Sequence, residues 1–161
     1  GSEMCIRDRR YIAEVMRPAI EDGAGRCDRD PTQIAVCMKP LVATAADRET
    51  LAQRIEIVRA RIAFYASTPG YRAVFALHGL GDLADRMSEL SRAQRWQEME
   101  NLISDEVLQT YAVVGTYDEI AERLQERFGQ LVTHLEFSIP VETKRDTLQL
   151  QSMLKQLRGT E

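Results

Sequence analysis

The sequence predicts an α/β protein that is mostly helical and contains two parallel strands joined through helices. Residues 34–43 form a nearly continuous apolar run, which is typical of a strand buried on both faces. Residues 135–139 alternate apolar and polar side chains, which is the pattern of a half-buried strand. A long helical stretch separates the two, and strands joined in this way pair in parallel with a right-handed crossover.

The segment before the first strand predicts a helix. Residues 10–24 carry apolar side chains at helical spacing, and Pro18 inside this segment predicts a kink. Gly23 and Gly25 predict the end of the helix. The first strand follows near residues 33–43, where Pro40 indicates a bulge or a strand end because it cannot donate a ladder hydrogen bond.

The clearest amphipathic helix follows residues 44–47, which resemble a capping box. Ser67-Thr68-Pro69-Gly70 interrupts this helix, since proline and glycine both break helical structure. The apolar side chains between these points recur at intervals of four and three and form one stripe: Leu51, Ile55, Val58, Ile62 and Tyr65.

The remaining elements alternate between helical and extended patterns. Residues 71–111 predict a series of shorter helices, and residues 113–115 are extended. A capping box at residues 116–119 opens another helix. The second strand, near residues 133–140, ends at a proline, and the last helix begins after it at residues 143–146.

Composition excludes several classes of function. The formal net charge is −4 and no basic block occurs, so a nucleic-acid partner is not expected. No apolar run approaches the ~20 residues that a membrane span requires. Cys5, Cys27 and Cys37 form no CxxC motif, which suits a reducing, cytoplasmic location. His78 and His134 are far apart in sequence and have no spaced metal-ligand partners, so no metal site is predicted.

The first eight residues predict an artefact or tag rather than part of the domain, which we place at residues 9–161. Gly1-Ser2 resembles a cloning remnant, and residues 2–9 resemble translated sequencing-adapter read-through of the kind found in metagenomic proteins. The alternative is an ordinary charged N-terminal tail.

Several segments within residues 9–141 resemble, in their order and spacing, the C-terminal part of the bacterial luciferase-like flavin monooxygenases. Within that family the deazaflavin-dependent (coenzyme F-420) oxidoreductases are the most similar branch. The resemblance lies in IAFYASTPGYR at 62–72 with LHG at 77–79, WQEM at 96–99 with SDEVL at 104–108, and VVGTYDEI at 113–120.

The resemblance implies a TIM (β/α)₈ barrel, which needs about 250 residues. This chain has 161 residues. It is therefore expected to be a C-terminal fragment of such a barrel, in which the two predicted strands are the seventh and eighth.

The resemblance also implies a function. The intact protein would use coenzyme F-420 to move a hydride to or from a small organic substrate, or reduced FMN and oxygen to oxygenate one. Much of the cofactor contact in the family comes from earlier strands, so the catalytic residues are expected in the missing part. The fragment is expected to be inactive alone, to bind no cofactor tightly, and to need the N-terminal half-barrel as its partner. Exposed strand edges would also favour a homo-oligomer.

The candidate binding residues are Thr44, Ser67, Thr68 and Tyr71. In a TIM barrel the active site lies at the carboxyl ends of the strands. Thr44 is near such an end, and the Ser67–Tyr71 turn could reach that mouth with two hydroxyls and a phenol. The alternative role of Thr44, Ser67 and Thr68 is helix capping.

Two further features have a functional and a structural interpretation. His78 could act as an acid or base, or it could cap a helix end. Gly115-Thr116 could bind phosphate at the start of a helix, or it could only cap that helix.

A second hypothesis for the whole chain is a self-sufficient helical interaction module. Such a module would bind a protein partner through the apolar stripe at residues 51–65. It would be a monomer that unfolds cooperatively, whereas a barrel fragment would expose apolar strand faces and associate.

Overall fold

The computed structural model describes residues 8–158, and about 63% of these residues are helical. The expectation of a mostly helical α/β chain is confirmed. The elements in chain order are α1 (Arg9–Tyr11), η1 (Ile12–Met16), α2 (Arg17–Arg26), η2 (Pro31–Gln33), β1 (Cys37–Met38), β2 (Leu41–Ala45), α3 (Arg48–Ala66), η3 (Pro69–Tyr71), α4 (Arg72–Ala76), α5 (Gly81–Arg92), α6 (Trp96–Glu100), α7 (Asp105–Tyr111), β3 (Ala112–Thr116), α8 (Ile120–Phe128), β4 (His134–Leu135) and α9 (Lys144–Leu157).

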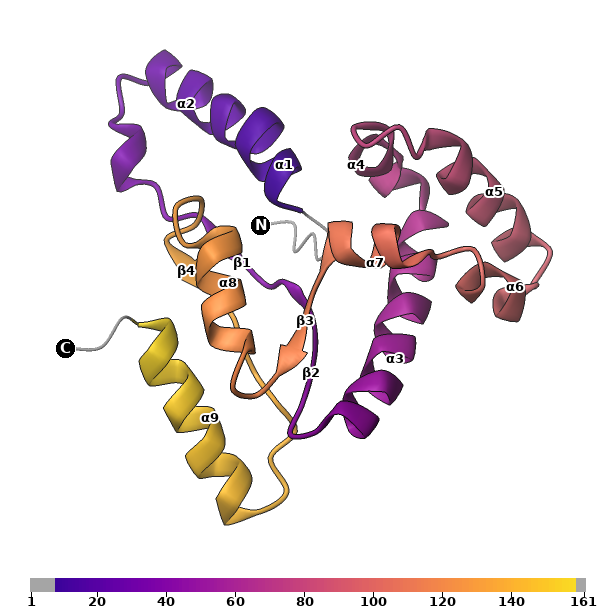
Figure 1. Ribbon diagram of the computed structural model, residues 1–161. Coiled ribbons are helices and arrows are strands. Elements are labelled where there is room, and N and C mark those ends of the chain that lie inside the picture. The colour runs from indigo at the N-terminus through magenta and orange to yellow at the C-terminus, as the bar shows by residue number, and fades with distance from the viewer. Residues whose placement is uncertain (1–7, 159–161) are drawn as a thin grey trace.

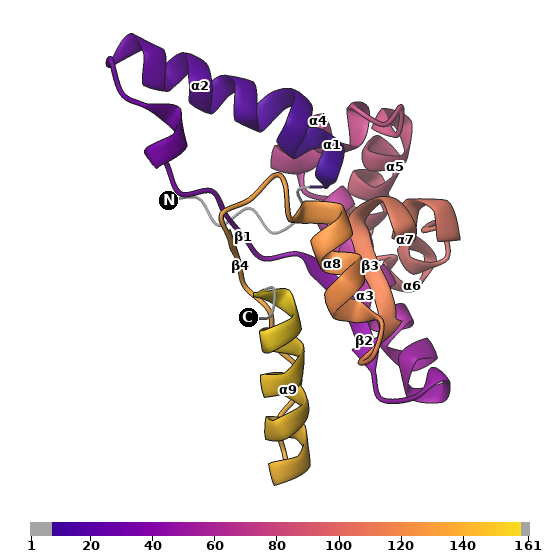
Figure 2. The ribbon, with the colours of Figure 1, turned by 60° about the vertical axis from the view of Figure 1, so that its left-hand side comes forward.

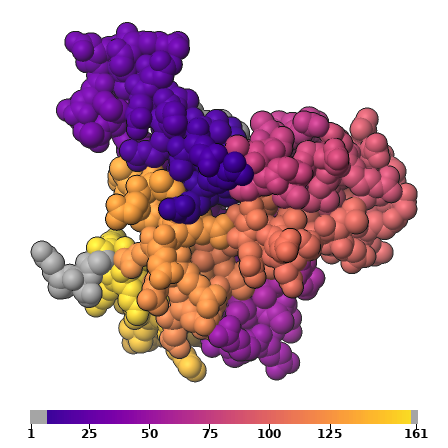
Figure 3. All heavy atoms as spheres, turned by 45° about the horizontal axis from the view of Figure 1, so that its top comes forward, coloured from indigo at the N-terminus to yellow at the C-terminus, as the bar shows by residue number. Residues whose placement is uncertain are grey.

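The N-terminal helical segment runs without a break from α1 through η1 to α2, and it projects from one end of the molecule (Figure 3). Pro18 follows closely on η1, a π-helical turn, where the backbone adjusts to the missing N–H of the proline inside this continuous helix. Gly23 lies inside α2, which continues to Arg26; the expectation that the glycines end the helix is wrong.

Two parallel strand pairs lie at the centre of the molecule. β2 pairs with β3 from Leu41 opposite Ala112 to Ala45 opposite Thr116. β1 pairs with β4 through only two residue pairs, which begin with Cys37 opposite His134. Pro40 lies between β1 and β2, as its missing N–H predicted.

The parallel pairing of the two expected strands is confirmed, but the expectation that these are the only substantial strands is wrong. The longer pair is β2 with β3, and β3 covers Ala112–Thr116, which the sequence indicated only as an extended segment. The alternating pattern at residues 135–139 does not produce a long strand, because ladder pairing stops after Leu135.

The order in which the strands pair differs from their order in the sequence. The segment 37–45 is the shared partner of both β3 and β4, and within the described residues β3 and β4 do not pair with each other. In the expected (β/α)₈ barrel the seventh and eighth strands are neighbours, and the pairing of β1 with β4 is compatible with that order, whereas β3 is an additional strand beside β2.

The long helix α3 packs on one face of β2 and β3 (Figure 1). Val58 is 6% exposed and Ile62 is fully buried, so the amphipathic stripe faces the core as predicted. It is therefore not available to a protein partner, which removes the surface that the interaction-module hypothesis required. This core also contains Leu41, Ala43 and Ala45 of β2 and the inner faces of α4 to α7.

The opposite face of the strands is covered by α8 and α9 (Figure 2). Val42 and Val113 point to this side and join a second core with residues of η1, α8 and α9: Ile12, Ile120, Leu124, Phe128 and Met153. The helix α9 begins at the predicted place, where Thr143 and Asp146 form a capping box with both hydrogen bonds present.

Two further expectations concern the surface and the environment. Within residues 8–158, none of the helices combines the length and apolar character that crossing a bilayer requires. Cys27 and Cys37 are free and exposed, and Cys5 lies outside the described residues.

Candidate functional site

The carboxyl ends of β2 and β3 lie side by side and lead directly into two helices. Tyr117 N–H donates to the Ala45 carbonyl at 2.9 Å, which extends the β2–β3 ladder by one bond. Asp47 then caps α3 by accepting from Thr50 N–H at 2.8 Å. The expected capping role of Thr44 is therefore wrong, since Thr44 lies within β2 and Asp47 performs the capping.

Glu119 joins the ends of the two strands. Its Oε2 accepts from the Thr116 backbone N–H at 2.8 Å and from the Thr116 hydroxyl at 3.0 Å. Its Oε1 accepts from Arg48 Nη2 at 2.8 Å and from Arg123 Nη2 at 3.2 Å. The Thr116 N–H is the main reason why the pKa of Glu119 falls to about 2, and the Thr116 hydroxyl and Arg48 lower it further against partial desolvation.

Two guanidinium groups therefore converge on one carboxylate oxygen at the strand ends. Arg48 comes from the first turn of α3, and Arg123 comes from α8. The Arg48 side chain is 71% exposed, so most of its donors face solvent. Arg123 also donates to the Val114 carbonyl, which fixes its position against β3. Such a pair can bind an anionic group through N–H donors that remain unused.

Thr44 is buried beside this cluster. It is 8% exposed, and its hydroxyl has no hydrogen-bond partner among the described residues. Its partner in the ladder is Gly115, where an added Cβ would lie 3.2 Å from Glu119 Cβ and 3.3 Å from Arg123 Cδ. Paired residues of neighbouring strands point to the same face, so the Thr44 side chain faces the start of α8. A buried hydroxyl without a protein partner is unfavourable unless a water or a ligand bonds it.

The other predicted binding residues lie elsewhere. The hydroxyls of Ser67 and Thr68 donate to the Phe64 carbonyl at 2.7 and 3.1 Å and so satisfy the end of α3. The Tyr71 ring packs edge-on against Tyr65 at 5.2 Å between centroids.

The length of α3 separates this turn from Thr44. The helix has 19 residues and is therefore about 28 Å long. The four predicted residues consequently do not form one site. The structure gives Ser67 and Thr68 a structural role at the end of α3, but not the expected capping of the next helix, since the Thr68 side chain makes no capping bond to η3. A binding role for the turn stays a prediction.

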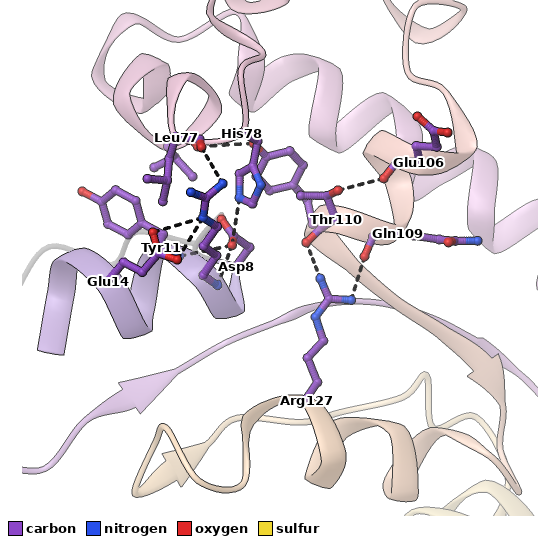
Figure 4. A network of polar contacts seen from close by, with 12 residues as sticks. Asp8, Tyr11, Glu14, Leu77, His78, Glu106, Gln109, Thr110 and Arg127 are labelled. Atoms are coloured by element: carbon purple, nitrogen blue, oxygen red, sulfur yellow. Dashed lines mark hydrogen bonds and ion pairs between the residues drawn. The ribbon is translucent and has the colours of Figure 1, made fainter.

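A buried polar network lies at the opposite end of the strands (Figure 4). Asp8 is 2% exposed and caps α1 by accepting from Arg10 N–H at 2.8 Å and Tyr11 N–H at 3.2 Å. The same oxygen lies 3.0 Å from His78 Nε2. The two atoms are within ion-pair distance, although the geometry of the contact is not that of a hydrogen bond. His78 thus lies against the start of the N-terminal helix.

Tyr111 and Arg127 complete this region. Burial raises the pKa of Tyr111, and the nearby Asp8 charge raises it further. Arg127 donates to the carbonyls of Gln109, Thr110 and Ala112, so it satisfies the end of α7 and the start of β3. Burial lowers the pKa of Arg127.

Apart from Thr44 and His78, sequence reasoning missed the polar residues of both clusters. Glu119 was identified only as part of a capping box, and Arg48, Arg123 and Arg127 were not singled out. The one local signal is the spacing of four between Glu119, Arg123 and Arg127, which places them on one side of a helix. Residues 8–158 contain no group of three or more His, Cys, Asp or Glu side chains placed to bind a metal ion.

Comparison with known proteins identifies the family. The family model of the luciferase-like monooxygenases matches residues 4–134. The chain belongs to the luciferase-like monooxygenase family. The match includes β2, β3 and α8, so the Arg48–Glu119–Arg123 cluster and Thr44 lie within the family's common region, whereas α9 lies beyond it.

Two curated relatives are much longer than the matching segment. Uncharacterized proteins of Mycobacterium bovis and Mycobacterium tuberculosis are each 44% identical to this luciferase-like chain over 119 residues. The aligned region is 74% of this chain and 35% of each relative. The chain therefore spans about a third of the length of these relatives.

Proposed function

We propose that this luciferase-like chain forms the C-terminal part of an oxidoreductase whose active site lies at the carboxyl ends of β2 and β3. The observation that carries this proposal is the cluster at these ends, where the buried Thr44 hydroxyl, which none of residues 8–158 bonds, lies beside the group formed by Arg48, Glu119 and Arg123. In parallel α/β sheets, ligands bind at the carboxyl ends of the strands. The 35% coverage of the relatives supports a larger parent protein, which we propose to be a TIM barrel.

The residues present suit the phosphate of FMN or of coenzyme F-420. Two guanidiniums share a single carboxylate, so the cluster can accept further negative charge. When bound, coenzyme F-420 would supply hydride transfer to or from an organic substrate, and reduced FMN with oxygen would supply oxygenation of one. Arg48 and Arg123 would hold its anionic group, and the Thr44 hydroxyl could donate to an adjacent oxygen.

Glu119 has a positioning role in this proposal. Because its pKa is near 2, it is ionised at neutral pH and keeps both guanidiniums at the strand ends. It also accepts from Thr116 N–H, which fixes the start of α8 relative to β3. An anion that binds the outward donors of Arg48 and Arg123 would meet a site that is already assembled, which lowers the ordering cost of binding.

The experiment uses a chimera in which the part of the M. tuberculosis relative that precedes its matching segment is fused ahead of residue 9. FMN and coenzyme F-420 are titrated into the chimera and into its Arg48→Gln and Arg123→Gln variants. At least one cofactor should bind, and each variant should weaken binding by roughly tenfold or more, since a charged hydrogen bond is worth about 1.5–3 kcal/mol. Arg86→Gln is the matched control, because Arg86 forms an exposed ion pair with Glu89 on α5, away from the cluster.

Equal cofactor affinity in the chimera and in all of its variants would show that the cluster is not part of the cofactor site. The Ser67–Tyr71 turn is the second candidate segment, and Thr68→Val and Tyr71→Phe test it in the same chimera. A loss of affinity in either variant, with unchanged stability, would move the proposed site to that turn.

A further inference from the structure

The strand β3 pairs with β2 along one edge, and among the described residues it has no second strand partner. Alternate residues of a strand direct their backbone N–H and C=O groups to opposite edges. Tyr117 N–H donates to the Ala45 carbonyl of β2, so the odd-numbered residues of this segment face β2. The backbone groups of Ala112, Val114 and Thr116 therefore form the outer edge of β3.

Helices α7 and α8 supply hydrogen-bond partners at both ends of this outer edge. Ala112 N–H donates to the Leu108 carbonyl, and the Ala112 carbonyl accepts from Arg127 at 2.9 Å. Thr116 N–H donates to Glu119 Oε2 at 2.8 Å, and the Thr116 carbonyl accepts from Glu119 N–H at 3.0 Å. These bonds occupy the groups through which a further strand would pair.

Val114, at the centre of the outer edge, depends on a single side chain. Its carbonyl accepts from Arg123, and within residues 8–158 its N–H has no hydrogen-bond partner. The Arg123 side chain is 46% exposed. Arg127 is held more firmly, because it is partly buried and also donates to the carbonyls of Gln109 and Thr110 (Figure 4). Arg123 is therefore the member of the cover whose replacement disturbs the core least.

The space beside the outer edge is hollow. A groove with a volume of about 530 Å³ runs along it and is lined by β3 residues together with Gln109, Arg123, Glu126 and Arg127. A strand edge beside free space is a template for another strand unless side chains cover it. The bonds from α8 and its first residues are therefore what keeps this edge closed.

A second copy of this chain is the partner that such an edge fits. Two identical edges that meet around a twofold axis pair in an antiparallel way, and the residue near the axis meets its own equivalent. With Val114 near the axis, the N–H of each copy faces the carbonyl of the other, as in a hydrogen-bonded pair of an antiparallel ladder. The two Arg123 side chains would then meet, and like charges oppose pairing. Arg123 thus blocks a second copy both by bonding the Val114 carbonyl and by its charge.

We propose that Glu119, Arg123 and Arg127 close the outer edge of β3 against strand addition, and that a second copy of the chain pairs there when Arg123 is removed. The three side chains are spaced by four residues and bond successive groups along the strand. The proposal goes beyond the proposed function, because it rests on the chain's own contacts and involves no cofactor.

The experiment measures amide exchange at Val114 in the 161-residue chain by NMR, at two protein concentrations about a hundredfold apart, because pairing with a second copy follows mass action. The variant Arg123→Met keeps an unbranched side chain without its donors, and Arg123→Lys keeps a charged donor. Arg86→Met is the matched control, since it removes an exposed arginine of α5 that pairs with Glu89. Circular dichroism checks that each variant is folded.

We expect Val114 exchange in Arg123→Met to slow by at least about tenfold at the higher concentration. In the wild type, Arg123→Lys and Arg86→Met, the exchange rate should be the same at both concentrations. Association through any other surface leaves the Val114 amide exposed, so it does not imitate this result.

Equal exchange of Val114 in Arg123→Met at both concentrations overturns the proposal. So does slowing in the wild type or in Arg123→Lys, whose edge would then be open in spite of the charged donor. Equal protection in Arg86→Met would assign the effect to lost charge alone, and loss of the helical signal in Arg123→Met would show that Arg123 holds the fold; either result also overturns it.

Discussion

The substitution Ile62→Ala tests how α3 holds the fold together. Ile62 is fully buried in the core between α3 and the strands. The change removes three carbon atoms, which is worth about 2.4 kcal/mol of lost transfer free energy. The cavity adds up to about 2 kcal/mol if the neighbours do not relax. We expect the free energy of unfolding to fall by about 2–5 kcal/mol in urea denaturation followed by circular dichroism.

Ile57→Ala is the matched control on the same helix. Ile57 is 54% exposed, so the same atoms are removed from a side chain that already contacts water. The higher helix propensity of alanine offsets part of the small loss, and we expect a change within about 0.5 kcal/mol. If Ile62→Ala cost less than 1 kcal/mol, or no more than Ile57→Ala, the assignment of this stripe to the core would be refuted.

Four further outcomes follow from the polar contacts. The pKa of Glu119 is about 2 when folded and near 4.5 otherwise, so its stabilisation is present above pH 4.5 and is lost as pH falls toward 2. The stability difference between the wild type and Glu119→Gln should therefore shrink over that range, and a constant difference would contradict the contacts. Thr44→Val should leave stability unchanged or raise it by up to about 1 kcal/mol, because no residue in the described range 8–158 bonds the hydroxyl; a clear loss in thermal unfolding would contradict this. Burial raises the pKa of Tyr111, so the folded protein keeps its phenol protonated and the free energy of unfolding should fall as pH rises past 10. The Tyr111→Phe variant should show a smaller fall over this range. An equal fall in the wild type and the variant would refute the burial argument. Asp8→Ala removes the α1 cap and should lower the unfolding free energy by about 0.5–2 kcal/mol in urea, and no loss would show that the N-terminal helix contributes little.

Local patterns predicted the helices well where burial follows a single period. The stripe through Val58 and Ile62 repeats at helical spacing, and the core confirms it. The capping box at Thr143 and Asp146 and the break at Pro40 depend only on neighbouring residues, so they too were predictable.

The strands were harder to predict, because their pairing depends on distant residues. Ala112–Thr116 is short, contains Gly115 and shows no alternation, yet it forms half of the longer strand pair. Both of its faces are buried, which removes the alternating signal. The segment at residues 135–139 does alternate, but its ladder with β1 ends at Met38, so it forms only a short strand.

In the candidate site, too, features that depend on local sequence were predicted and features that depend on distant residues were not. Thr44 was predicted from its place near a strand end, and it lies at the cluster. Arg48 and Glu119 are 71 residues apart in sequence, and no local pattern reports their contact. The Ser67–Tyr71 turn was placed at the same mouth, but the direction of α3 carries it to the other end of that helix.

The most direct test of the central claim is the stoichiometry of cofactor binding, measured by equilibrium dialysis of FMN and coenzyme F-420 against the 161-residue chain and the chimera. The account predicts that the chimera binds one cofactor per molecule and that the chain alone binds neither tightly, because the chain supplies only part of the site. A folded chimera that binds neither cofactor, or a 161-residue chain that binds one as tightly as the chimera, would contradict it.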